Sequence, residues 1–157
     1  MYLFEKNTIN LIKIKIDLLL ILFFLFFFNN AYAEEKFIGF IDTLDGNAAI
    51  TKGEDSIKLN EFDQIFTNDK IIIDEGTSII ISFTDNSLLT IKDESEFFVK
   101  EFDKDSSKPS FILSITEGKF SFESGSIAKN KNGVMKIKLS GMDVKLNGTL
   151  VVGQNAG

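Results

Sequence analysis

Two groups of neighbouring acids have residue types that could perform acid–base chemistry. One group is Asp93, Glu94 and Glu96, and the other is Glu61 and Asp63. Two carboxyl groups about 5 to 9 Å apart can hydrolyse a glycosidic bond, one as the acid and the other as nucleophile or base. The chain holds 23 Asp and Glu residues among 157, so neighbouring acids are expected by chance. No Trp accompanies them as a platform for a sugar ring. Glycan hydrolysis is therefore kept only as an alternative.

A second candidate is a calcium loop, because Asp42, Asp45 and Asn47 surround Gly46. Such a loop needs oxygen ligands at alternating positions and a Glu at its twelfth position. Gly53 stands at that twelfth position, so we interpret the stretch as a turn. The chain has neither His nor Cys, which excludes the usual zinc sites, Ser-His triads, Cys-His dyads and disulfides. We expect no enzyme activity and no cofactor or metal.

The polar cluster Asp85-Asn86-Ser87 interrupts the apolar stretch FTDNSLLTI (residues 83–91). Asp and Asn tolerate left-handed backbone and bond their own main chain, so we interpret the cluster as a turn without chemistry. A three-residue loop at 85–87 places apolar residues opposite one another, whereas a two-residue loop at 85–86 does not. The predicted register is Phe83 opposite Leu89, Ile81 opposite Ile91 and Ser82 opposite Thr90.

The first 33 residues have the pattern of a secretory signal. A start with three lysines precedes an apolar run at 18–28, and Ala31 and Ala33 have the spacing of a cleavage site. The eleven residues of the run are fewer than the about 20 that span a bilayer. We predict a signal helix within 1–33 and a mature domain at 34–157. The alternative is an uncleaved anchor, in which case this segment is the only membrane contact.

The charge pattern argues against a nucleic-acid partner. The formal net charge is −6, and lysines and acids are interspersed along the chain. Several phenylalanines do not follow a clean alternation, and we expect most of them to pack in the core. Exposed ones would form a surface for a binding partner. The residues concerned are Phe62, Phe66, Phe97, Phe98 and Phe102.

Beyond residue 36, short runs typical of strands are separated by Gly, Asn, Asp and Ser, and no 12-residue window has helical spacing. In 111–124, alternation predicts a hairpin with a two-residue turn at Glu117-Gly118. Its pairs would be Ile115 with Phe120 and Leu113 with Phe122. The polar stretch 103–110, which holds the one Pro of the chain, is predicted to be the longest loop.

A second hairpin is predicted in 135–146, with its turn at Ser140-Gly141. The dipeptide Asn147-Gly148 favours a type I′ turn and would start another reversal through Thr149. The predicted pairs of the second hairpin are Leu139 with Met142, Ile137 with Val144, Met135 with Leu146 and Lys138 with Asp143.

The runs KIIID (70–74) and SIIISF (78–83) are apolar on both faces, which predicts strands that are covered on two sides. These features together predict an all-β domain of short, mostly antiparallel strands. We expect a β roll, a solenoid-like arrangement or a sandwich, preceded by the signal helix.

Several motifs, taken in order, resemble the FecR domain family. The segments 38–52 and 60–97 are similar to its opening strands and its Gly-Asp-x-Ile-x-Thr element. The hexapeptide FTDNSL stands on the family's Phe-x-Asp-Gly-Ser element, with Asn86 in place of Gly. The segment 113–152 is similar to the later half, with Asn147-Gly148-Thr149 in place of an Arg-Gly-Thr turn. The resemblance covers roughly residues 38–152.

The resemblance implies a non-catalytic β domain that faces the bacterial envelope. In the best-known members, such a domain receives a signal from an outer-membrane transporter and controls a sigma factor across the inner membrane. The roughly 17 residues before the apolar run are fewer than the cytoplasmic segment of those members. We therefore expect a periplasmic or secreted module that binds an envelope protein or another envelope component.

Two other functions remain open from the sequence. The first is a membrane-anchored sensor that passes a signal on, and the second is a carbohydrate-processing enzyme. The resemblance names no partner and leaves open whether a C-terminal part of the domain lies beyond Gly157.

Overall fold

The chain divides into two units, Met1–Glu34 and Glu35–Gly157. The computed structural model describes residues 15, 35–53, 55–140, 142–146 and 150–155. In these ranges no helix has the length and apolar character needed to cross a membrane. The predicted signal segment, with Ala31 and Ala33, lies outside the described residues apart from Lys15.

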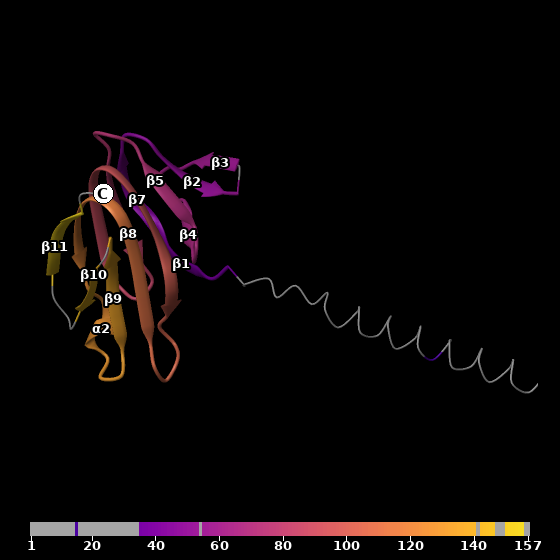
Figure 1. Cartoon of the computed structure of the whole chain (residues 1–157), viewed down its shortest axis with the longest axis vertical. Helices are drawn as coiled ribbons and strands as arrows, with labels where there is room; N and C mark the ends of the chain where they lie inside the picture. Colours follow the sequence, from indigo (N-terminus) through magenta and orange to yellow (C-terminus); the bar gives the residue numbers. More distant parts are fainter. Residues whose placement is uncertain (1–14, 16–34, 54, 141, 147–149, 156–157) are drawn as a thin grey trace, which may run out of the picture. The chain divides into compact units, whose positions relative to one another are not determined.

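The second unit is a mostly antiparallel β sheet that curls into a half-barrel (Figure 1). Strands make up 66% of the structure and helix 4%, which confirms the predicted all-β class. The one short helix among the described residues of this unit, α2 (Ser126–Lys129), was not predicted. The strands are β1 (Phe37–Asp45), β2 (Ala48–Lys52), β3 (Asp55–Lys58), β4 (Gln64–Phe66), β5 (Lys70–Ile73), β6 (Ser78–Phe83), β7 (Leu88–Asp103), β8 (Ser110–Glu123), β9 (Val134–Leu139), β10 (Met142–Leu146) and β11 (Leu150–Asn155).

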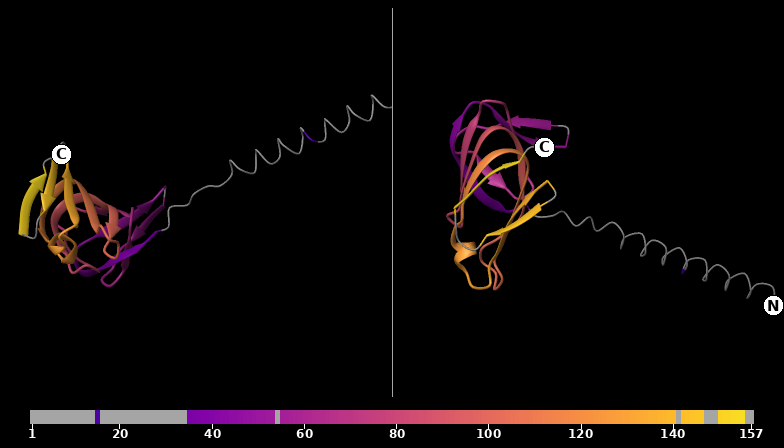
Figure 2. Two further views of the ribbon diagram at one scale, coloured as in Figure 1. Left: turned by 90° about the horizontal axis from the view of Figure 1, so that it is seen from below. Right: turned by 60° about the vertical axis from the view of Figure 1, so that its left-hand side comes forward.

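The long strands β7 and β8 form the centre of the sheet, and the loop 104–109 joins them. One path through the sheet runs in the order β10-β9-β8-β7-β5-β2-β3. The strand β7 also pairs with β6, β6 pairs with β1, and β1 pairs with β4. The strands β9 and β11 pair with different parts of β8. β9 pairs with residues 110–114, and β11 pairs with residues 118–123. Figure 2 shows how this branched sheet curves round a single interior.

A bend in the β7–β8 pair corrects the first predicted hairpin. Glu117 and Gly118 do not form a turn but lie within the continuous strand β8. Gly118 has φ +106°, and three β7 residues face it between the pairs Lys92–Lys119 and Glu96–Glu117. Extra residues in one strand produce a bulge, which bends the strand pair without reversing it. The predicted pairs are therefore wrong, and on β7 the true partners are Phe97 for Ile115, Val99 for Leu113, Ile91 for Phe120 and Leu89 for Phe122.

The β6–β7 turn has three residues, as predicted, but begins one residue earlier. The Phe83 amide donates to the Ser87 carbonyl at 2.9 Å, which encloses Thr84, Asp85 and Asn86. Asn86 has φ 64°, the left-handed position that closes a three-residue loop. The Ser87 amide donates to Asp85 Oδ1 at 3.0 Å, so the Asp85 side chain ends the loop at Ser87.

This earlier turn makes the predicted register wrong by two residues. The observed pairs are Ser82 with Leu88, Ile81 with Leu89 and Ile79 with Ile91. A shift of two residues leaves each side chain on its predicted face, because side chains alternate with a period of two. The predicted inward residues of this hairpin are therefore still inward.

The predicted hairpin at 135–146 is confirmed in register. Strands β9 and β10 pair Leu139 with Met142 and Lys138 with Asp143. The predicted turn residues Asn147, Gly148 and Thr149 lie outside the described residues. The strand that follows them, β11, pairs with β8.

The prediction that 70–74 is covered on both sides is wrong. Ile71 and Ile73 on β5 are fully buried, but Ile72 between them is 38% exposed. Ile80 on β6 is likewise only half-buried. The sheet curls round one interior, so each of these strands has one covered face and one face toward solvent.

Aromatic rings fill the interior beside the aliphatic side chains. Phe111 is fully buried, and its ring centroid lies 4.8 Å from that of Phe83, 5.1 Å from that of Phe102 and 5.5 Å from that of Phe122. All three contacts have edge-to-face geometry, which is favourable beyond the area buried. In a chain without disulfides, this packing must supply the stability of the domain.

Candidate functional site

The Asp85-Asn86-Ser87 motif forms a buried junction with the segment that begins α2. Asp85 and Ser87 are 1% and 0% exposed. The Ser87 hydroxyl donates to Asp85 Oδ2 at 2.9 Å and accepts a hydrogen bond from the Gly125 amide at 2.8 Å. The Asp85 carbonyl accepts a hydrogen bond from the Ser126 amide at 2.7 Å. These bonds fasten the β6–β7 turn to the start of α2.

Close packing at this junction leaves no room for a ligand. A Cβ atom built at Gly125 would overlap the backbone of residues 85–87. Burial of a carboxylate is costly unless it accepts hydrogen bonds, and Asp85 accepts them from the amide and hydroxyl of Ser87. We therefore assign the motif a role in holding two segments together.

One acid pair considered for hydrolysis is engaged with the main chain. Glu61 Oε1 accepts a hydrogen bond from the Leu44 amide at 3.2 Å. Asp63 Oδ2 accepts one from the Asn60 amide at 2.8 Å. The first contact holds the turn between β3 and β4 against β1, and the second lies within that turn.

The second acid group is divided between different partners. Glu96 lies 2.8 Å from the Lys70 ammonium. Asp93 Oδ1 accepts hydrogen bonds from the amides of Gly76 and Glu94, and these bonds, the one from Gly76 first, lower the pKa of Asp93. Within the described residues, no group of three or more His, Cys, Asp or Glu side chains could hold a metal ion.

Three exposed phenylalanines lie on β1 and in the turn before β4. Phe37, Phe40 and Phe62 are 40%, 38% and 73% exposed, and we call them the aromatic surface. The Phe62 amide donates to the Ile41 carbonyl at 2.8 Å, which places Phe62 beside the strand that carries the other two. Phe62 also has φ 69°, a conformation that costs an L-residue about 1 to 2 kcal/mol. Strained backbone that presents an exposed aromatic ring is typical of functional positions.

A charged group borders the aromatic surface. The Phe37 ring packs edge-on against Phe66 with centroids 6.1 Å apart, and Lys52 Nζ lies 5.9 Å from the centroid of the Phe66 ring. Lys52 Nζ also lies 2.8 Å from Glu35 and 3.2 Å from the buried Asp69. The hydrogen bond to Glu35 is the main cause that raises the pKa of Lys52. Charged groups therefore lie beside the Phe37 end of the aromatic surface, and a polar rim is usual at protein-binding surfaces.

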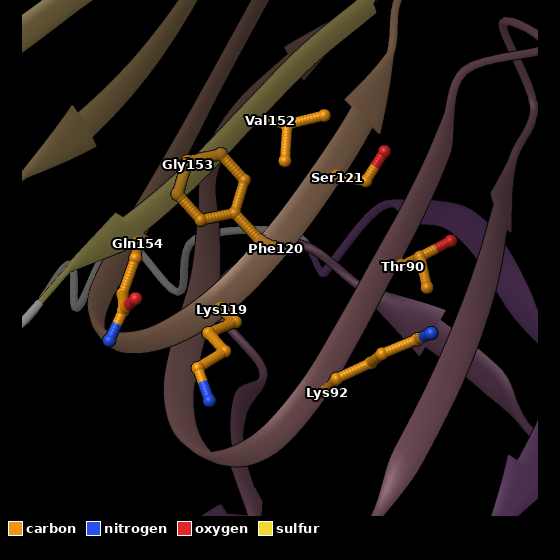
Figure 3. Close-up of a pocket in the computed structure, with 8 residues that line it drawn as sticks. All are labelled: Thr90, Lys92, Lys119, Phe120, Ser121, Val152, Gly153 and Gln154. Carbon is orange, nitrogen blue, oxygen red and sulfur yellow. The ribbon is translucent and has the colours of Figure 1, made fainter.

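A separate pocket of about 470 Å³ lies on β7, β8 and β11 (Figure 3). Along each strand, most of the residues that line the pocket alternate with buried residues. Their side chains therefore lie on the solvent side of the sheet, and the pocket opens on that side. The pairing of the three strands arranges six of these residues in two rows, Thr90-Ser121-Val152 and Lys92-Lys119-Gln154. We call it the lysine pocket, and its lining is Thr90, Lys92, Lys119, Phe120, Ser121, Val152, Gly153 and Gln154.

Sequence reasoning missed the lysine pocket and two of the three rings of the aromatic surface, for identifiable reasons. Alternation marks Lys92 and Lys119 as outward residues, but the predicted hairpin at 117–118 would have turned Lys119 away from β7. Phe37 and Phe40 stand in a run that has no clean alternation, so their exposure could not be read from spacing. Phe62 was among the phenylalanines considered for a binding surface, and of that group it is the exposed one.

Comparison with known proteins identifies a family. A family model described as FecR protein matches residues 69–156, which confirms the predicted resemblance. The match begins later than the predicted residue 38 and contains the Asp85 junction and the whole lysine pocket, whereas the aromatic surface precedes it. No curated protein and no solved structure matches the chain.

Proposed function

Because the chain belongs to the FecR family, we propose that residues 34–157 are an exported, non-catalytic module that binds a protein of the bacterial envelope. The observation that carries this proposal is the aromatic surface of Phe37, Phe40 and Phe62. Aromatic side chains are enriched among the residues that dominate the binding energy of protein interfaces.

The exposure of Phe62 supports binding because folding buries little of this ring. Each aromatic side chain buries about 150 to 250 Å² when it is fully covered, and Phe62 is 73% exposed. A partner that covers Phe62 would therefore bury most of the apolar area of this side chain. The partner would contact β1 and the turn before β4, without any reaction in a pocket.

Export is supported by the pattern of the N-terminal segment. Three lysines, the apolar run at 18–28 and the spacing of Ala31 and Ala33 together favour cleavage after Ala33. The module would then act in the periplasm or outside the cell.

A pull-down from envelope extracts tests the proposed function. The exported protein is the bait, and Phe40→Ser and Phe62→Gly are the variants that remove two rings of the aromatic surface. Ile72→Thr is the matched control, because Ile72 is 38% exposed but lies on β5. We expect the wild type and the control to retain the same partner and the two Phe variants to lose it. Retention of nothing specific by the wild type, or equal retention by all four proteins, contradicts the proposal.

Membership of the FecR family also favours a second candidate, a sensor anchored by an uncleaved N-terminal segment. Such a sensor would pass the binding of a partner on to a regulator across the membrane. Sequencing the N-terminus of the protein from cells separates the two candidates. A first residue of Glu34 supports export, and an intact Met1 supports the anchored sensor.

A further inference from the structure

The lysine pocket brings two like charges together on adjacent strands. Lys92 on β7 pairs directly with Lys119 on β8. Like charges directly opposite one another in a sheet are unfavourable. Figure 3 shows the two side chains extending in different directions from their strands, as expected for ammonium groups that repel each other. The sheet also pairs Lys136 on β9 directly with Lys145 on β10, but of these two lysine pairs only Lys92 and Lys119 line the pocket.

The acids near the pocket balance this charge only in part. Asp93 lies 3.7 Å from the Lys119 ammonium, and both side chains remain about half exposed, at 47% and 58%. Lys92 forms no ion pair with any residue of the described ranges. At least one positive charge is thus available beside a cavity.

The other residues of the pocket add hydrogen-bonding groups and one apolar contact. The hydroxyls of Thr90 and Ser121 belong to directly opposed residues, and Gln154 is opposite Lys119. Val152, in the row beside them, is 74% exposed. The volume of about 470 Å³ is within the usual range for small-molecule sites.

We propose that the lysine pocket binds a small organic anion, whose carboxylate or phosphate group lies between Lys92 and Lys119 while its apolar part contacts Val152. Lysine is a common ligand for both groups, and hydroxyl and amide groups complete the hydrogen bonding of their oxygens. The lysine pocket is separate from the aromatic surface. The protein would therefore bind a small ligand in addition to the protein partner of the proposed function.

Titration of the isotope-labelled exported protein, followed by NMR, tests this proposal. The probes are benzoate for a carboxylate, phenyl phosphate for a phosphate and benzyl alcohol as the neutral analogue. We expect at least one anion to shift the amide signals of β7, β8 and β11 saturably, and benzyl alcohol to bind more weakly by about tenfold or more. A preference between the two anions identifies which group the pocket accepts.

Charge-removing variants then locate the binding. Lys92→Gln and Lys119→Gln should each weaken binding of the preferred anion by about fivefold or more, with a smaller dependence on salt. Lys58→Gln is the matched control, because Lys58 is an exposed lysine on β3 outside the pocket. Absence of saturable binding, equal binding of benzyl alcohol, or equal loss in the control overturns the proposal. The two pocket variants should still retain the protein partner in the pull-down. Loss of anion binding can then be distinguished from failure of the proposed protein binding.

Discussion

The Ser87 hydroxyl accepts a hydrogen bond from the Gly125 amide at 2.8 Å, across 38 residues of the chain. The same hydroxyl donates to Asp85 Oδ2 at 2.9 Å, so one oxygen joins the β6–β7 turn to the segment before α2. All three residues are buried. Tertiary contacts therefore support the turn in addition to its local bond from the Ser87 amide to Asp85.

Replacement of Ser87 by Ala should destabilise the domain by about 1 to 3 kcal/mol. The variant leaves the Gly125 amide buried without its partner, and a buried polar group without a hydrogen bond is costly. Urea unfolding followed by far-UV circular dichroism measures the change. Ser82→Ala on the same hairpin is the control, because Ser82 is only half-buried, and we expect it to change the free energy of unfolding by less than about 0.5 kcal/mol. Equal effects of the two variants would contradict the assigned role of Ser87.

Replacement of Gly125 by Ala should destabilise the domain by about 1 to 3 kcal/mol for a steric reason. Gly125 has φ −92°, outside the left-handed region that favours glycine, and an added Cβ would overlap the Asp85–Ser87 backbone. Gly76→Ala is the matched control, because Gly76 has open space around it and φ +74°, and it should cost about 1 kcal/mol from the backbone alone. Thermal unfolding of both variants separates crowding from backbone strain. A smaller loss for Gly125→Ala than for Gly76→Ala would show that the junction can open at little cost.

The sequence predicted the fold class and the inward faces because both depend on alternation, which is a local property. Ile81 and Phe120, for example, lie on their predicted faces although their predicted partners were wrong. The partners depend on where the chain reverses, and this is where the prediction failed. Gly118 permits either a turn or a bulge, and only the long β7–β8 pairing selects the bulge. Likewise, the Asp85 side chain accepts a hydrogen bond from the Ser87 amide, which ends the β6–β7 turn and sets the register. The spacing of apolar residues does not reveal this bond.

The candidate surfaces were less predictable than the fold. The lysine pocket needs three strands in register, and β11 reaches β8 from the far end of the sequence. The aromatic surface depends on the conformation of Phe62, whose positive φ has no signal in residue type. Residue types therefore indicated which side chains could bind, whereas the long-range pairing decided which of them lie together.

Asp93 should make the stability of the domain depend on pH in the acid range. The amides of Gly76 and Glu94, followed by the charge of Lys119, lower the pKa of Asp93 from its ordinary value of 3.8. The unfolded chain therefore takes up this proton first as the pH falls. The stability that ionised Asp93 contributes is present above pH 3.8 and is lost as the pH falls through the folded pKa.

The variant Asp93→Asn tests this dependence. Asn tolerates the φ of 78° at this position and its amide oxygen can accept the same two hydrogen bonds, but it does not titrate. We expect urea midpoints between about pH 5 and about pH 2 to fall less steeply for the variant than for the wild type. Lys119→Gln should keep most of the wild-type slope, because the backbone amides are the larger cause of the lowered pKa. Equal slopes for Asp93→Asn and wild type would refute the assignment.

Replacement of Phe62 by Gly should separate stability from binding. Glycine adopts the φ of 69° without the strain of about 1 to 2 kcal/mol, but it also gives the unfolded chain more freedom, which offsets about 0.5 to 1 kcal/mol of that gain. The ring is 73% exposed, so little buried area is lost. We expect the free energy of unfolding to stay unchanged or to rise by up to about 1.5 kcal/mol, while the protein partner is lost in the pull-down. Phe62→Asn, which also tolerates this φ, should behave alike in both measurements. A loss of more than about 1 kcal/mol in either variant would mean that the Phe62 ring packs for folding, and the aromatic surface would then lose its main argument as a binding site.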